Sequence, residues 1–243
     1  MLTDLLTKKQ IVDSHKSLKK MDYIISINQF VDFSKGTDSK KRRIINQQKN
    51  PNPFRISLYQ TSRASIKRSL ANNGDSKPII EGLERLKSKI PVKPRQLMNK
   101  TVSIEAIKRY MNIKIPSILR NHKINIIKKP KIKSIFIEGV EILISPDVIF
   151  TMEYDNRKYI GGVKIHISKH NIFKKEDSLK VALLIEEYLN IISTDYNAEV
   201  LPELCFSLDV FGGKMICSPE NKKLILSEIK DIAREIKVLW KVA

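Results

Sequence analysis

The chain of 243 residues contains only two cysteines, Cys205 and Cys217. With no second pair, they do not form the pattern of a zinc site or of a disulfide framework. No run approaches the roughly 18 apolar residues that span a bilayer. The first ten residues, MLTDLLTKKQ, lack the long apolar stretch of a secretory signal. These absences predict a protein of the reducing cytoplasm without a membrane span.

The common DNA-reading motifs are also missing. The sequence has no Cys/His finger, no heptad repeat after a basic region and no helix-turn-helix glycine. Any contact with nucleic acid is therefore expected to involve phosphates rather than base edges.

Positive charge is in excess, and it is unevenly distributed. Residues 1–130 contain 29 Lys and Arg against 9 Asp and Glu, a net of +20, whereas residues 131–243 contain 16 against 17. An AT-biased bacterial genome would raise the lysine content of both halves, so it does not account for the asymmetry. The asymmetry indicates a basic region that meets a polyanion, DNA or RNA first and an anionic membrane surface second.

Three short strands are predicted between residues 134 and 170, at 134–137, 140–150 and 159–168. In the second strand, buried positions alternate through Ile142, Ile144, Val148 and Phe150. Pro146 cannot donate to a sheet ladder, so this strand is expected to bend or bulge there and to turn Asp147 toward a cleft.

In the third strand, alternation separates two faces. Lys164 and His166 share one face, and the apolar face is formed by Val163, Ile165 and Ile167. The apolar face is expected to be buried, while Lys164 faces the cleft that it shares with Asp147.

Pro146-Asp147 on one strand and Gly162-Val163-Lys164 on the next, with Glu138-Gly139 ahead of them, resemble the motif of the PD-(D/E)XK nuclease superfamily. The resemblance covers about residues 103–243. It implies an α/β fold of the restriction endonuclease-like type, with a mixed central sheet flanked by helices. It also implies phosphodiester hydrolysis with Mg²⁺ or Mn²⁺, in which Asp147 binds the metal and Lys164 positions or activates the attacking water.

The sequence departs from the family pattern at Gly162, where the family has Asp or Glu two residues before the Lys. Some members place this acid on the following helix, predicted here over 176–192. The candidate acids on that helix are Glu176 and Asp177 as further metal ligands and Glu186 and Glu187 as catalytic groups. The RecB-like exonuclease branch carries Gln-x-x-x-Tyr on this helix, and here Tyr188 matches the Tyr while Leu184 stands at the Gln.

The first hundred residues lie outside the resemblance and predict a basic, mainly helical region, 1–100, ahead of a nuclease-like domain, 101–243. Helices are predicted at 38–48, 56–70 and 78–90, followed by an extended basic linker at 91–99 and a further helix capped by Ser103. The residues expected to bind nucleic acid lie on the first two helices: Lys40, Lys41, Arg42, Arg43, Arg63, Lys67 and Arg68.

A hairpin is predicted toward the end of the chain, with strands at 204–211 and 214–217 joined by Gly212-Gly213. The last helix is expected to begin at Ser218-Pro219.

Three functions are consistent with these patterns. The first is a metal-dependent DNA nuclease acting in restriction, repair or phage defence. The second is a nucleic-acid-binding protein that keeps the nuclease fold without catalysis, as Gly162 suggests. The third is an assembly subunit whose basic face docks an acidic protein. A homodimer or a partner protein is compatible with each of them.

Overall fold

The computed structural model describes residues 23–51 and 58–242, which form an α/β structure with two mixed sheets. The smaller sheet has the order β1-β4-β3 and pairs β1 with β4 in parallel and β3 with β4 antiparallel. Its strands are β1 (Ile24–Ser26), β3 (Ser134–Ile137) and β4 (Val140–Leu143).

The larger sheet has the order β2-β5-β6-β7-β8, in which β6 and β7 run parallel and the other neighbours antiparallel. Its strands are β2 (Ile124–Ile126), β5 (Val148–Tyr154), β6 (Arg157–His166), β7 (Glu199–Asp209) and β8 (Lys214–Cys217).

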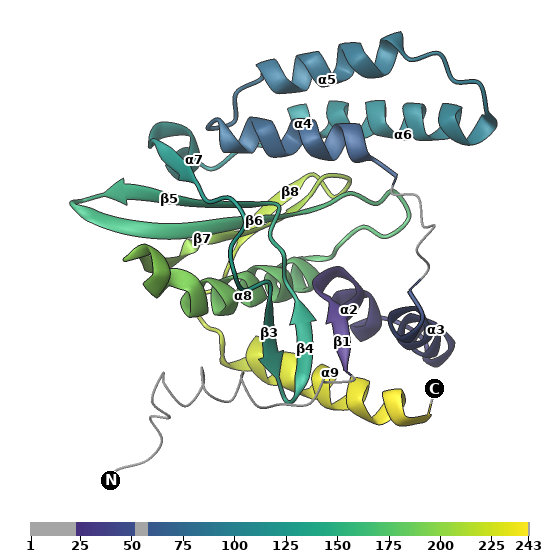
Figure 1. Ribbon diagram of the computed structural model, residues 1–243, viewed down its shortest axis with the longest axis vertical. Helices are drawn as coiled ribbons and strands as arrows, with labels where there is room; N and C mark the ends of the chain where they lie inside the picture. Colours follow the sequence, from purple (N-terminus) through teal and green to yellow (C-terminus); the bar gives the residue numbers. More distant parts are fainter. Residues whose placement is uncertain (1–22, 52–57, 243) are drawn as a thin grey trace.

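The helices lie in layers around the two sheets (Figure 1). One face of the larger sheet is covered by α4 (Gln60–Ala71) and α6 (Pro94–Met111), and α5 (Lys77–Ser88) packs on these two helices from the outside. The other face packs on α8 (Lys175–Ile192), which separates the two sheets. Beyond α8 lie the smaller sheet with α2 (Ile27–Ser34), α3 (Asp38–Lys49) and α9 (Lys223–Val242), and the short helices are α7 (Ser117–Asn121) and η1 (Ser193–Tyr196).

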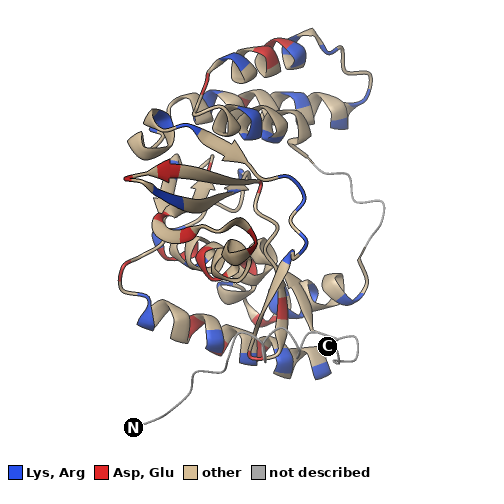
Figure 2. Ribbon diagram, turned by 60° about the vertical axis from the view of Figure 1, so that its left-hand side comes forward, with Lys and Arg blue, Asp and Glu red and all other residues tan. Residues whose placement is uncertain are grey.

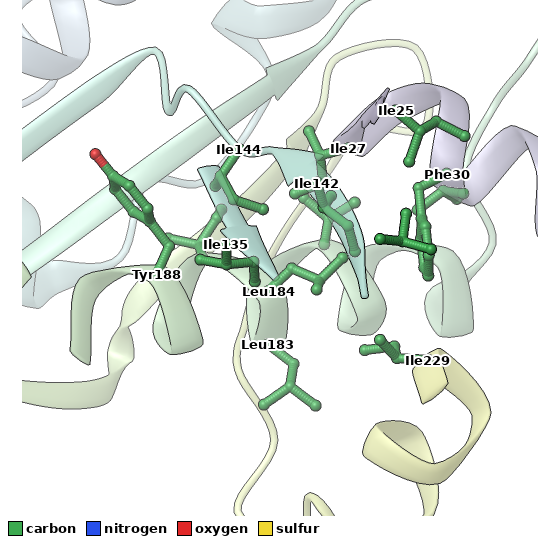
Figure 3. Close-up of a cluster of buried hydrophobic side chains, with 14 of the residues drawn as sticks. Ile25, Ile27, Phe30, Ile135, Ile142, Ile144, Leu183, Leu184, Tyr188 and Ile229 are labelled. Carbon is green, nitrogen blue, oxygen red and sulfur yellow. The ribbon is translucent and has the colours of Figure 1, made fainter. Parts of the chain in front are cut away.

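Two hydrophobic clusters hold these layers together. One lies between α4–α6 and the larger sheet, and the other joins α8 to both sheets, to α2 and to α9. Figure 3 shows the second cluster, in which Leu184 of α8 lies near Ile135 of β3 and Ile142 of β4. Because α8 lies between two sheets, it is buried on most of its faces, as its apolar sequence predicts.

The strand predicted over 140–150 is divided between the two sheets. Residues up to Leu143 belong to β4, and the chain crosses to the larger sheet before β5 begins at Val148. The prediction of one continuous strand is therefore wrong, although the expected interruption at Pro146 lies at the crossing. All four predicted apolar positions are buried: Ile142, Ile144, Val148 and Phe150. They do not share one core, because the first two belong to the cluster around α8 and the last two to the cluster under α4–α6, and Ile149 is buried as well.

Three local predictions are corrected by the structure. The segment 91–99 is not an extended linker, because α6 begins at Pro94, and Ser103 therefore lies buried inside α6 rather than at its cap. The last helix begins at Lys223 rather than at Ser218. The backbone N–H of Ser218 donates to the carbonyls of Pro202 and Cys205, which holds this residue against β7.

The helix predicted over 56–70 is observed from Gln60, and residues 52–57 lie outside the described residues. The predicted domain boundary between residues 100 and 101 falls inside α6. Helices from both sides of that boundary contribute to each hydrophobic cluster. Within the described residues, no helix has the length and apolar character that crossing a membrane requires.

Candidate functional site

The site predicted around Asp147 lies where β5 begins. The N–H of Asp147 donates to the carbonyl of Val163 on β6 at 2.8 Å, whereas the preceding Pro146 has no N–H to continue the ladder. Side chains complete the pairing of the next β6 position. The N–H of Ile165 donates to Asp147 Oδ2 at 2.8 Å. The carbonyl of Ile165 accepts from Arg63 Nη1 at 2.8 Å.

Arg63 also forms an ion pair with Asp147, from Nη1 to Oδ1 at 2.9 Å. Both carboxylate oxygens are therefore engaged, one by a guanidinium from α4 and the other by the backbone of β6. The Asp147 side chain is 12% exposed and that of Arg63 is 34% exposed, so removing the carboxylate would leave a partly buried guanidinium without its counter-charge. This geometry gives Asp147 a structural role at the end of the ladder.

Lys164 lies beside this pair and holds the crossing between the two sheets. Its Nζ donates to the carbonyl of Ile144 at 3.0 Å and to that of Ser145 at 2.7 Å. Burial lowers the pKa of Lys164, while the charge of Asp147 opposes that shift. The structure thus brings Asp147 and Lys164 close together where β5 begins. The expected burial of the other face is confirmed at Val163, Ile165 and Ile167.

A cavity of about 450 Å³ opens beside Asp147, and lysines dominate its polar wall. These lysines are Lys67 of α4 and Lys128, Lys129 and Lys133 of the loop between β2 and β3. Within residues 23–51 and 58–242, none of their ammonium groups forms an ion pair. Since the carboxylate in the wall is already neutralised by Arg63, the cavity is suited to an anion. This cavity, defined by its four lysines, is called the lysine cavity below.

Tyr188 forms part of the lysine cavity wall from α8. Its hydroxyl donates to the carbonyl of Ile132 at 2.8 Å, and burial raises the pKa of Tyr188 to about 12. The phenol therefore stays neutral and anchors the loop that carries three of the lysines. Leu184, at the position of the Gln in the exonuclease motif, is fully buried in the core.

The four acids of α8 are distributed over different surroundings. Glu186 is buried and forms an ion pair with Lys222, and Asp177 accepts from Lys35 Nζ at 2.9 Å. Glu187 lines a separate cavity next to β3, where burial raises its pKa, and Glu176 is exposed. In the described part of the chain, these acids do not gather with Asp147 into a cluster of three or more. The catalytic and metal-binding roles predicted for them stay predictions.

Gly162 lies where β6 packs closely on α8. A Cβ at this position would lie 3.3 Å from Ile185 and 3.4 Å from Leu189, both on α8. An acidic side chain would thus enter the apolar contact between β6 and α8. Mg²⁺ and Mn²⁺ require several oxygen ligands, so either metal would have to displace Arg63 from Asp147 and recruit a further acid from elsewhere in the chain.

Restoring the family acid by Gly162→Asp is expected to lower the free energy of unfolding by about 2 kcal/mol, because a carboxylate would be buried against apolar side chains. Urea denaturation of the variant and the wild type measures this change. The expected loss is the same with and without Mg²⁺. A variant that gains stability specifically in Mg²⁺ would contradict this account of position 162.

The basic residues predicted to bind nucleic acid separate into two groups. Arg63 and Lys67 of α4 lie at the Asp147 site, and Arg68 on the same helix lies 3.9 Å from Glu81. On α3, Lys41 Nζ forms an ion pair with Glu235 of α9 at 2.5 Å. Its neighbours on α3 are the half-buried Lys40 and the exposed Arg42 and Arg43.

Sequence reasoning missed the three loop lysines, Lys128, Lys129 and Lys133. The signal that could have found them is the run KKPKIK at 128–133, which leads into the first predicted strand. Residues 58–133 contain 19 Lys and Arg against 4 Asp and Glu, a net of +15. Figure 2 shows basic residues along α4, α6 and this loop, whereas basic and acidic residues alternate along α9.

Most of the excess charge thus belongs to the α4–α6 layer and the loop beneath it.

A comparison of the chain with protein-family models found no match, and a comparison with curated proteins found none either.

Proposed function

We propose that this chain binds the phosphate backbone of a nucleic acid and that Asp147 has a structural rather than a catalytic role. The observation that carries the proposal is that Arg63 neutralises Asp147 while the lysine cavity opens directly beside it. An unpaired group of lysines repels itself, and a bound phosphate relieves that repulsion.

We further propose that the fold is of the restriction endonuclease-like type. Support comes from the antiparallel pair β5–β6, from α8 following β6, and from the parallel pairing of β6 with β7. The family that this order resembles acts on DNA, so DNA is the first nucleic acid to test. RNA is the second.

A second candidate function is metal-dependent hydrolysis of DNA. The observation that favours it is the position of Lys164 beside Asp147, the pair that the nuclease motif requires. Hydrolysis of this kind would need Asp147 to exchange Arg63 for Mg²⁺ or Mn²⁺ and to recruit another acid. Incubation of a labelled duplex with the protein and either metal tests it, and cleavage that EDTA stops would make this the better function.

The proposed binding is expected to depend on salt and not on divalent metal. Fluorescence anisotropy with a labelled duplex should give an affinity that falls steeply with salt, with a slope of about 0.9 per phosphate contact. Adding EDTA should leave the affinity unchanged. If neither DNA nor RNA binds at low salt, the proposal fails, and an acidic protein partner becomes the better explanation of the basic surface.

A further inference from the structure

The loop between α5 and α6, residues 89–93, presents apolar side chains to solvent. Ile90 is 89% exposed and Val92 is 85% exposed, on either side of Pro91. In the first turns of α6, Leu97 and Met98 are also about half exposed. These residues form the apolar tip discussed below, and apolar side chains gathered at one projecting site are typical of a contact surface.

The apolar tip is held in a defined conformation by hydrogen bonds. Lys100 Nζ donates to the carbonyl of Lys87 at 2.8 Å and to that of Lys89 at 2.7 Å. The Oε1 atom of Gln96 accepts from the N–H of Val92 at 2.9 Å and from that of Lys93 at 3.1 Å. Because the loop is already ordered, a partner that binds it pays little conformational entropy.

The charge around the tip has one sign. Residues 85–100 contain no Asp or Glu, and their basic residues are Arg85, Lys87, Lys89, Lys93, Arg95 and Lys100. The tip continues the α4–α6 layer, which lies within the segment 58–133 and its net charge of +15. The surroundings of the apolar tip are therefore complementary to a polyanion.

We infer that the apolar tip contacts the bases of the bound nucleic acid, with Ile90 and Val92 inserted at a base step and the flanking cations on phosphates. This inference rests on the proposed function. Proteins that deform duplexes insert Ile, Leu, Met or Pro in this way beside Arg and Lys. An anionic membrane is the less favoured partner, because a membrane-surface helix presents an apolar face along its length, whereas here exposure is confined to a loop and the turns beside it.

The double substitution Ile90→Ser/Val92→Ser tests the inference, with Leu224→Ser/Val238→Ser on α9 as the matched control. Leu224 is 74% exposed and Val238 is 64% exposed, so both variants should keep the wild-type melting temperature. We expect the tip variant to bind a labelled duplex about tenfold more weakly, with an unchanged salt slope because no charge is removed. The wild type and the control, but not the tip variant, should raise the fluorescence of 2-aminopurine in that duplex, because insertion unstacks the base.

Each other outcome has a distinct meaning. If the tip variant binds and unstacks DNA like the wild type, the inference is overturned while the proposed function stands. If the wild type binds no nucleic acid, the proposed function itself fails. If the wild type binds vesicles of phosphatidylcholine and phosphatidylserine, and the tip variant loses only that binding, the tip is a membrane contact and the inference is overturned.

Discussion

Asp147→Ala is expected to lower the free energy of unfolding by about 3 kcal/mol. The substitution leaves the guanidinium of Arg63 without its counter-charge and the N–H of Ile165 without its acceptor. It also removes the charge that stabilises the ammonium of Lys164. Chemical denaturation followed by circular dichroism measures the change, and a double-mutant cycle with Arg63→Met isolates the contribution of the ion pair.

The control for this experiment is Glu153→Ala, which removes an exposed carboxylate from the far end of β5. That variant should stay within about 0.5 kcal/mol of the wild type. A carboxylate kept only to bind a metal would give a different result, because its removal would leave the metal-free protein at least as stable as before. Wild-type stability of Asp147→Ala would therefore argue against the structural role and in favour of hydrolysis.

The second large effect is expected from the lysine cavity. Replacing Lys67, Lys128, Lys129 and Lys133 together with Ala should weaken binding to duplex DNA on the order of 100-fold at moderate salt. The salt slope should fall by about 3 to 4, because up to four phosphate contacts are lost. These side chains are exposed, so the melting temperature should change little.

The matched control replaces the same number of charges on α3, at Lys40, Lys41, Arg42 and Arg43. Lys41 is already paired with Glu235, so this variant removes fewer available cations. We expect it to weaken binding by less than the cavity variant, by about tenfold. A larger effect from α3 than from the lysine cavity would move the interface to α3, one of the two helices on which the sequence predicted it.

Much of the local structure can be predicted from the sequence. The strand at 134–137 is observed where it was predicted, and the helices predicted at 38–48 and 176–192 match α3 and α8 to within a residue. The segment 24–33 mixes strand and helix spacing, and the chain does change there from β1 to α2 at Ile27. Pro146 marks the end of a ladder, because a residue without an N–H cannot continue one.

The sequence by itself also determines that Asp147 and Lys164 are neighbours, because they lie on adjacent strands of a short hairpin. It likewise determines that the chain carries its excess of positive charge before residue 131. Both follow from local order along the chain: strand pairing across a short turn, and a count of charges.

The chemistry of the site depends on contacts that only the tertiary structure decides. Arg63 lies 84 positions before Asp147 in the chain, and no local pattern indicates that α4 brings its guanidinium to the start of β5. The packing of Ile185 and Leu189 over Gly162 depends in the same way on where α8 crosses the sheet. A sequence motif predicts which residues are adjacent on neighbouring strands. The ionic partner of a carboxylate depends instead on every element that packs around it in the tertiary structure.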